Sequence, residues 1–221
     1  MNWAGIRKTV GIGVAAAAIG CGGGGGSSGG GASGGGSTLP AATHTVTTAR
    51  AITAPADRAL MVFLCPADCE PFAIVDGSGA IVAQVATHNR ALVDVAPGTV
   101  TFYALAGAEG DRISGEVSAG GVYYAAISTH GAMPRFTTVS PRSADGRWDH
   151  VAEYLNDTHE TEIDPAHRAE LDAQIVTPQL RPRMTALDTR AGEMDAMHQD
   201  ERTLHAEDGT ATPPGTSASG M

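Results

Sequence analysis

Between residues 59 and 140 the chain alternates short apolar runs with turn signals that contain glycine or proline. The runs are ALMVFL, FAIVD, IVAQVA, RALVDVA, TVTFYAL, RISGEVS, GVYYAAI and RFTTVS. Such runs, repeated at a spacing of roughly 8–12 residues, are typical of antiparallel sandwiches and barrels. The pattern therefore predicts a mainly β fold, an antiparallel β-sandwich of about 7–8 strands. We place the strands at 59–64, 72–76, 81–86, 90–96, 99–105, 112–118, 121–127 and 135–140.

Alternation within the runs assigns side chains to faces. In RISGEVS, Ile113 and Val117 point to one side of the strand, and Arg112, Ser114 and Glu116 point to the other. TVTFYAL alternates in the same way. The sequence DGSG between the second and third runs predicts a tight hairpin, because glycine takes the positive φ that such turns need.

After Pro141 the strand pattern stops and short helices are expected. RWDHVAEYLND, residues 147–157, places its apolar side chains on one face. We expect Trp148 and Tyr154 to pack against the sandwich, which is otherwise poor in aromatic residues.

Two further helices are predicted in the acidic C-terminal part. Asp164 followed by Pro165 is a typical helix start, and that helix would end near residue 175. A later helix at 184–204 has few large apolar residues and is expected to be marginal. Thr177-Pro178 repeats the helix start of Asp164-Pro165, but Pro182 is expected to disturb the turn that follows it.

These elements divide the chain into five parts. The composition of the last part is that of a disordered tail. The parts are a signal peptide (1–20), a cysteine with a Gly/Ser-rich disordered tether (21–50), the β-sandwich (51–144), an acidic helical extension (145–205) and the tail (206–221).

The first part has the organisation of an export signal. Arg7 and Lys8 form a short basic start, and residues 9–19 form an apolar run of small residues. A membrane-spanning helix needs about 20 apolar residues, so this run is too short to be a permanent anchor. A basic start, a short apolar centre and small residues at the end are typical of a secretory signal peptide.

The end of that run, Ala18-Ile19-Gly20-Cys21, resembles the lipobox of bacterial lipoprotein precursors. The resemblance implies that Cys21 receives lipid after cleavage before it, although leucine is usual where Ala18 stands. One acyl chain binds a membrane only marginally, whereas two or three would hold the protein stably. The residues from 22 to 42 would then act as a tether with a reach of roughly 25 Å and a limit of about 70 Å. The alternative is an ordinary secreted protein with a free thiol.

A second resemblance covers residues 59–142. The stretches ALVDVAPGTVTFYA, SAGGVYYAAI and PRFTTVSP are similar to a group of small bacterial lipoprotein domains. That resemblance implies an immunoglobulin-like or transthyretin-like β-sandwich. It brings no catalytic residues with it, and a fold does not determine a function.

Charge is unevenly distributed in a chain whose formal net charge is −10. Residues 41–144 hold eight acids and six arginines, whereas residues 145–208 hold sixteen acids and six arginines. Binding to nucleic acid or to anionic lipid headgroups needs basic patches, so neither is an expected partner.

With Cys21 assigned to lipid, Cys65 and Cys69 remain in LCPADCEPF. An even pair in an exported protein indicates a disulfide. The turn-forming insert Pro66-Ala67-Asp68 could bring the two together, which an extended strand could not. Redox catalysis usually uses C-x-x-C spacing, and a metal site would need two more ligands.

No stretch carries a strong catalytic or metal-binding pattern. His159, Glu162 and His167 are weak metal candidates, because the histidines are eight apart with Pro165 between them. We interpret 158–167 as a polar connector. Outside the Gly/Ser-rich stretch no serine lies in a G-x-S-x-G elbow. The tyrosines of the strands are more typical of sheet residues than of a sugar-binding platform.

Together these features predict a bacterial cell-envelope lipoprotein held by lipid on Cys21. The resemblance to lipoprotein precursors implies the outer rather than the inner membrane, because acidic residues directly after the cysteine often favour retention in the inner membrane in that family, and Gly22 and Gly23 are not acidic. We expect a non-enzymatic β-sandwich interaction module without cofactors, whose partner is an envelope protein or a cell-wall component. The alternatives are a lipoprotein that binds sugar or peptidoglycan fragments, and a simply secreted binding protein.

Overall fold

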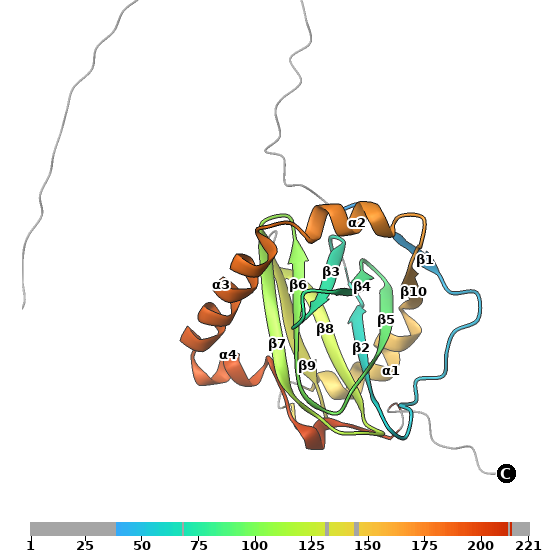
Figure 1. Ribbon diagram of the computed structural model, residues 1–221. Coiled ribbons are helices and arrows are strands. Elements are labelled where there is room, and N and C mark those ends of the chain that lie inside the picture. The colour runs from blue at the N-terminus through green and yellow to red at the C-terminus, as the bar shows by residue number, and fades with distance from the viewer. Residues whose placement is uncertain (1–38, 68, 131–132, 144–145, 212, 214–221) are drawn as a thin grey trace, which may run out of the picture. The chain divides into compact units, whose positions relative to one another are not determined.

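The computed structural model describes residues 39–67, 69–130, 133–143, 146–211 and 213, and Cys21 lies outside them. The described chain is mainly β, as predicted (Figure 1). Its strands are β1 (Thr43–Thr45), β2 (Ala59–Cys65), β3 (Phe72–Asp76), β4 (Ile81–Val85), β5 (Asn89–Val95), β6 (Gly98–Ala106), β7 (Glu109–Val117), β8 (Val122–His130), β9 (Met133–Val139), β10 (His159–Ile163) and β11 (Thr203–Leu204). Its helices are η1 (Arg147–His150), α1 (Val151–Asn156), α2 (Arg168–Ile175), α3 (Leu180–Glu193), α4 (Ala196–Asp200) and η2 (Ala206–Asp208).

The strands form two mixed sheets. One has the order β1-β10-β5-β2-β8-β9, and the other has the order β11-β7-β6-β3-β4. Three neighbouring pairs are parallel, namely β2–β8, β10–β5 and β11–β7, and the others are antiparallel. The prediction of a purely antiparallel sandwich of about 7–8 strands is therefore wrong in pairing and in strand number.

All eight predicted strands are present as β2 to β9, with ends shifted by no more than three residues. The three strands that the sequence did not predict are β1 (THT), β10 (HETEI) and β11 (TL). They are short and rich in polar residues, so no apolar alternation marks them. Each forms because a neighbouring strand offers unpaired backbone groups, which is a tertiary effect.

The inner faces of the two sheets share one aromatic core. Phe63 of β2 lies 5.1 Å from Phe102 of β6 and 6.1 Å from Phe136 of β9, measured between ring centroids. Tyr123 of β8 and Ile113 of β7 are buried in the same core. Ile113 therefore faces inward, as the alternation of RISGEVS predicted.

The outer face of each sheet is covered as well. Leu60, Val62 and Leu64 of β2 pack with Val151 of α1 in a second apolar cluster. Because both faces of β2 are covered, its sequence reads as a continuous apolar run instead of an alternation. Trp148 joins this cluster and makes an edge contact with the ring of Tyr124, with ring centroids 5.9 Å apart, and Tyr154 is packed there too.

Helices α2 and α3 cover the outer face of the five-stranded sheet (Figure 1). Leu171, Leu180, Met184 and Leu187 of these helices pack against buried residues of β3 and β6 in a third apolar cluster. Burial of each such side chain contributes about 1.5–3 kcal/mol, which stabilises helices that would be marginal alone. The acidic extension is thus part of the same folded unit as the sandwich.

The predicted helix at 184–204 is corrected in position and length. Helix α3 starts earlier, at Leu180, and includes Pro182. Pro182 is the third helical residue, where the missing backbone N–H has no intrahelical partner to lose. The helix ends at Glu193, because the next residue, Met194, has an extended ψ of 152°. The chain becomes helical again after Asp195, whose side chain accepts a hydrogen bond from the backbone N–H of His198 and so caps α4.

The expected start of the preceding helix is shifted too. Asp164 caps a turn, accepting a hydrogen bond from the N–H of Ala166 at 2.9 Å, and α2 begins only at Arg168. The predicted polar connector at 158–167 is also corrected, since β10 occupies its first half and pairs with both β1 and β5.

Part of the expected tether belongs to the folded unit. Leu39 and Ala42 are buried in the cluster beneath α2 and α3. The side chain of Gln84 on β4 accepts a hydrogen bond from the N–H of Ala42 at 2.7 Å and donates one to the carbonyl of Pro40 at 2.8 Å. The described fold therefore starts at Leu39, within the range 21–50 that the sequence assigned to the tether.

Residues 198–210, which we call the closing segment, join the two sheets at β7 and β9. The backbone N–H of Ser114 donates to Arg202 O at 3.1 Å, and that of Thr138 donates to Glu201 O at 2.8 Å. Leu204 is buried in the inner core. The prediction of a disordered tail from residue 206 is therefore wrong for its first residues, which include η2.

The closing segment also protects an edge strand. Phe136 and Thr138 of β9 donate their outward N–H groups to the Asp111 carboxylate (2.8 Å) and to Glu201 O. Pro134 on the same strand has no N–H to offer. This edge is therefore unavailable for pairing with another strand.

Gly115 is required where the closing segment touches β7. A Cβ on Gly115 would overlap the backbone of Leu204. We expect Gly115→Ala to lower the free energy of unfolding by about 2–4 kcal/mol, because β11 must move away. Urea unfolding measures this. Gly192→Ala is the matched control, since a Cβ there meets no neighbouring atom, and an equal effect of both changes would contradict the role of Gly115.

Truncation tests the closing segment directly. A chain that ends at Ala211 keeps the sheet contacts named above and should unfold cooperatively at nearly the native temperature. A chain that ends at Asp200 loses Arg202 and Leu204, and we expect it to lose cooperative unfolding or to expose its core. Differential scanning calorimetry distinguishes the two, and equal melting temperatures would show that the segment does not hold the sheets together.

Candidate functional site

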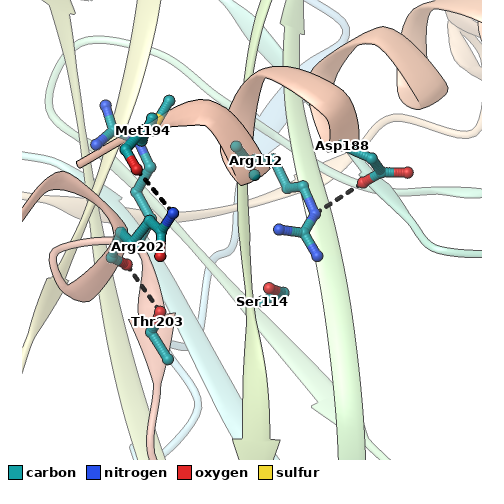
Figure 2. Close-up of a pocket in the computed structure, with 9 residues that line it drawn as sticks. Arg112, Ser114, Asp188, Met194, Arg202 and Thr203 are labelled. Atoms are coloured by element: carbon teal, nitrogen blue, oxygen red, sulfur yellow. Dashed lines mark hydrogen bonds and ion pairs between the residues drawn. The ribbon is translucent and has the colours of Figure 1, made fainter. Parts of the chain in front are cut away.

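A polar cleft opens between β7, the end of α3 and the closing segment. It has a volume of about 330 Å³, near the lower end of the range for small-molecule pockets. Figure 2 shows the side chains around it. The lining residues are Arg112, Ser114, Asp188, Ala191, Gly192, Met194, Gln199, Arg202 and Thr203.

Strand β7 supplies one wall of the cleft. Arg112 and Ser114 lie on its outer face, and Ile113 between them is buried in the inner core. The strand therefore holds a cation and a hydroxyl side by side on a rigid element. The sequence predicted this shared face from the alternation of RISGEVS.

Arg112 is oriented by a carboxylate from α3. Its Nε lies 2.8 Å from Oδ1 of Asp188, and the hydroxyl of Tyr103 donates a hydrogen bond of 2.9 Å to the same oxygen. Burial, together with this hydrogen bond, raises the pKa of Tyr103 to about 12. Tyr103 therefore stays protonated at physiological pH and keeps donating to Asp188.

The terminal nitrogens of Arg112 are turned away from Asp188, on the side where Ser114 lies (Figure 2). The side chain of Arg112 keeps 28% of its surface accessible. Its Nε, by contrast, is buried and makes no well-aligned hydrogen bond. The end of the guanidinium, which points away from Asp188 (Figure 2), has the geometry to bind an anion through two parallel hydrogen bonds.

The opposite wall is held by local hydrogen bonds. Gln199 donates from Nε2 to Met194 O at 2.7 Å, and the Thr203 hydroxyl donates to Gln199 O at 2.7 Å. Arg202 is committed elsewhere, because its Nε bonds both oxygens of Asp111 at 3.1 and 2.9 Å and its Nη1 donates to His198 O. Arg112 is therefore the cation of this cleft that remains accessible to a ligand.

The lining residues supply hydrogen-bonding groups, one accessible cation, Arg112, and the carboxylate of Asp188 beside it. The hydroxyl of Ser114 has no histidine beside it among the residues that line the cleft. A serine hydroxyl needs an adjacent base to act as a nucleophile. The arrangement is therefore suited to binding a small polar molecule.

The two cysteines of LCPADCEPF form a disulfide in the structure. Their Cα atoms are 6.6 Å apart, within the range that a disulfide can bridge. Cys65 ends β2 in the inner core and Cys69 is buried close to it. The predicted pairing is confirmed, and the disulfide fixes the turn between β2 and β3.

The weak metal candidates occupy separate positions. His159 and Glu162 are exposed on β10, and His167 precedes α2, where its Nδ1 lies 3.1 Å from Asp164. Across residues 39–67, 69–130, 133–143, 146–211 and 213, no group of three His, Cys, Asp or Glu side chains is arranged to hold a metal ion. Of these candidates, only His167 has a carboxylate partner close by.

The tyrosines of the described strands offer no exposed face for stacking on a sugar. Tyr103, Tyr123 and Tyr124 are each at most 4% exposed. Trp148 packs against Tyr124, as described above. A sugar could therefore bind only through polar contacts at these elements.

The sequence did not reveal the cleft as a site, although it placed Arg112 and Ser114 on one face. Asp188, Gln199 and Thr203 lie on segments that were expected to form a single marginal helix. No local pattern indicates that these segments return to β7. The signal that could have pointed to the site is the arginine on a strand that is otherwise half apolar.

Within the part of the chain that the structure describes, no helix is both long enough and apolar enough to cross a membrane. Comparison with known proteins found no matching family model, no matching curated protein and no matching solved structure.

The pair Asp111–Arg202 beneath the cleft is expected to matter for stability. The two side chains are only 6% and 11% exposed. Arg202→Met leaves the carboxylate buried without its partner, so we expect a loss of about 3–5 kcal/mol. Arg168→Met is the matched control, because the Arg168–Asp172 pair lies on the surface and should contribute less than about 1 kcal/mol. Urea unfolding measures both, and losses of equal size would contradict the buried role of Arg202.

Proposed function

We propose that this chain is a bacterial cell-envelope lipoprotein, anchored by lipid on Cys21, which presents its folded unit as a non-enzymatic binding module. The observation that carries the proposal is the order of features before residue 22. A basic start is followed by a short apolar run and then by Ala18-Ile19-Gly20-Cys21. This order is typical of an export signal, and its end resembles the lipobox of bacterial lipoprotein precursors.

The position of Leu39 supports the division between anchor and module. Leu39 is buried in the fold and comes 18 residues after Cys21, so residues 22–38 would be the spacer in the proposed arrangement. These residues are almost all glycine and serine. As a flexible chain they would have a reach of roughly 23 Å and a limit of about 60 Å. That length would hold the module clear of the lipid headgroups.

The disulfide supports export. Disulfides form and persist in oxidising compartments, such as the bacterial periplasm and the cell surface. Cys65 and Cys69 are bonded to each other, which leaves Cys21 as the cysteine available for lipid. The absence of acidic residues at Gly22 and Gly23 favours the outer membrane over the inner one.

The surface of the module favours a second candidate function, the binding of a small ligand such as a sugar or a peptidoglycan fragment. Among the described residues, the large hydrophobic side chains that are exposed are Met133, Val176 and Met197, which lie on different segments. The edge of β9 is occupied, and the apolar side chains of α3 are buried. The cleft beside Arg112 is therefore a better candidate for the binding site than an apolar surface or a sheet edge that would dock a protein.

Labelling with radioactive palmitate tests the anchor. We expect wild type to incorporate label and to fractionate with membranes, and Cys21→Ala to lose both properties. The double variant Cys65→Ser/Cys69→Ser is the matched control and should still be labelled, because those cysteines pair with each other. Unlabelled, soluble wild-type protein would show that the protein is simply secreted.

The same cells test the choice of membrane. If Gly22 favours transfer to the outer membrane, wild type should be found there and Gly22→Asp should stay in the inner membrane. Identical distribution of both proteins would contradict this part of the proposal.

A further inference from the structure

We propose that the cleft beside Arg112 binds a small carboxylate that also carries hydrogen-bond donors. The inference deepens the second candidate function and rests on it. It does not depend on the anchor at Cys21, so palmitate labelling and ligand binding can fail independently.

The guanidinium of Arg112 determines the charge of the ligand. Its Nε side is taken by Asp188 at 2.8 Å, and its terminal nitrogens are turned toward the side of Ser114 (Figure 2). Two parallel N–H groups match the two oxygens of a planar carboxylate. Because β7 and Asp188 fix the arginine before any ligand arrives, little side-chain entropy is lost on binding.

The neighbouring charges favour a single negative charge over two. Asp188 remains next to Arg112 and is 48% exposed, so it repels a second negative charge. Arg202 cannot compensate, because Asp111 and the carbonyl of His198 already occupy it. A phosphate dianion would therefore be disfavoured relative to a carboxylate.

The remaining lining explains why the ligand should carry donors. Ala191 and Gly192 belong to the last turn of α3, where backbone carbonyls lack the N–H partners of a continuing helix. The carbonyl of Ala191 accepts only a long hydrogen bond, 3.4 Å, from the N–H of Met194. That end of a helix carries a partial negative charge, which favours hydroxyl or ammonium groups. The cleft is therefore positive at Arg112 and negative at the end of α3.

The volume limits the ligand to a small molecule. About 330 Å³ is enough for a short peptide end or a single sugar acid. Both present the same chemistry, a carboxylate with donor groups a few bonds away. They differ in the donor, which is an ammonium or amide in the peptide and a hydroxyl in the sugar.

Isothermal titration calorimetry with the purified full chain in detergent tests the proposal. The probes are D-alanyl-D-alanine, glucuronate, inorganic phosphate and glucose. We expect at least one of the two carboxylates to bind with one-to-one stoichiometry at concentrations up to about 10 mM, and phosphate and glucose to bind at least about tenfold more weakly. Binding of the dipeptide alone would identify a peptide end, and binding of glucuronate alone would identify a sugar acid.

Variants test the role of each wall. Arg112→Gln should lower the affinity for the carboxylate at least about tenfold. Arg58→Gln is the matched control, because Arg58 is an exposed arginine that does not line the cleft, and it should bind as wild type does. Thermal unfolding of each variant shows whether it is folded.

Ser114→Ala provides a second test in case Arg112→Gln does not fold. The backbone N–H of Ser114, not its hydroxyl, bonds to Arg202 O next to β11. Loss of the hydroxyl should therefore leave the fold intact and lower the affinity for the carboxylate several-fold. The proposal is overturned if neither carboxylate binds or if phosphate binds as tightly as they do. It is also overturned if Arg112→Gln and Ser114→Ala, when folded, bind the carboxylate as tightly as wild type does.

Discussion

The buried carboxylate of Asp111 connects three parts of this structure, the strands β7 and β9 and the closing segment. It accepts hydrogen bonds from the N–H of Phe136 on β9 and from Nε of Arg202 in the closing segment, while its own backbone belongs to β7. A carboxylate buried in this way is stable only while its hydrogen-bonding partners stay in place. The two sheets, the closing segment and the floor of the cleft therefore depend on one another.

Both sheets are covered on both faces, because a chain with few aromatic residues cannot build a large core between the sheets alone. With only 5% aromatic residues in the chain, the inner core alone is small. Strands β2 and β3 bury both of their faces, and α1, α2 and α3 cover the outer sides. The acidic extension, despite its charge, supplies the leucines that complete the outer layer over β3 and β6. Most of its acidic residues are exposed or half-buried, whereas Glu160 is buried and accepts a hydrogen bond from the backbone N–H of Arg50 at 2.8 Å.

The cleft is a consequence of how the extension returns to the sheet. Helix α3 ends at Glu193, and the chain turns back through α4 to pair with β7 as β11. The turn leaves a space above Arg112 and Ser114 that side chains do not fill. A rigid strand, a helix end and an ordered loop thus surround one accessible cation in a protein of strongly negative net charge. This arrangement is the physical basis of the binding function that we propose.

The sequence by itself determined the strands β2 to β9, the face shared by Arg112 and Ser114, and the pairing of Cys65 with Cys69. Burial alternates with a period of two, and turn residues act locally, so both can be read from neighbouring residues. Only the tertiary structure decided the parallel pairing of β2 with β8, the strands β1, β10 and β11, and the contact between Asp111 and Arg202, which lie 91 residues apart. Short polar segments and single ion pairs carry no periodic signal, because their partners are supplied by distant parts of the chain.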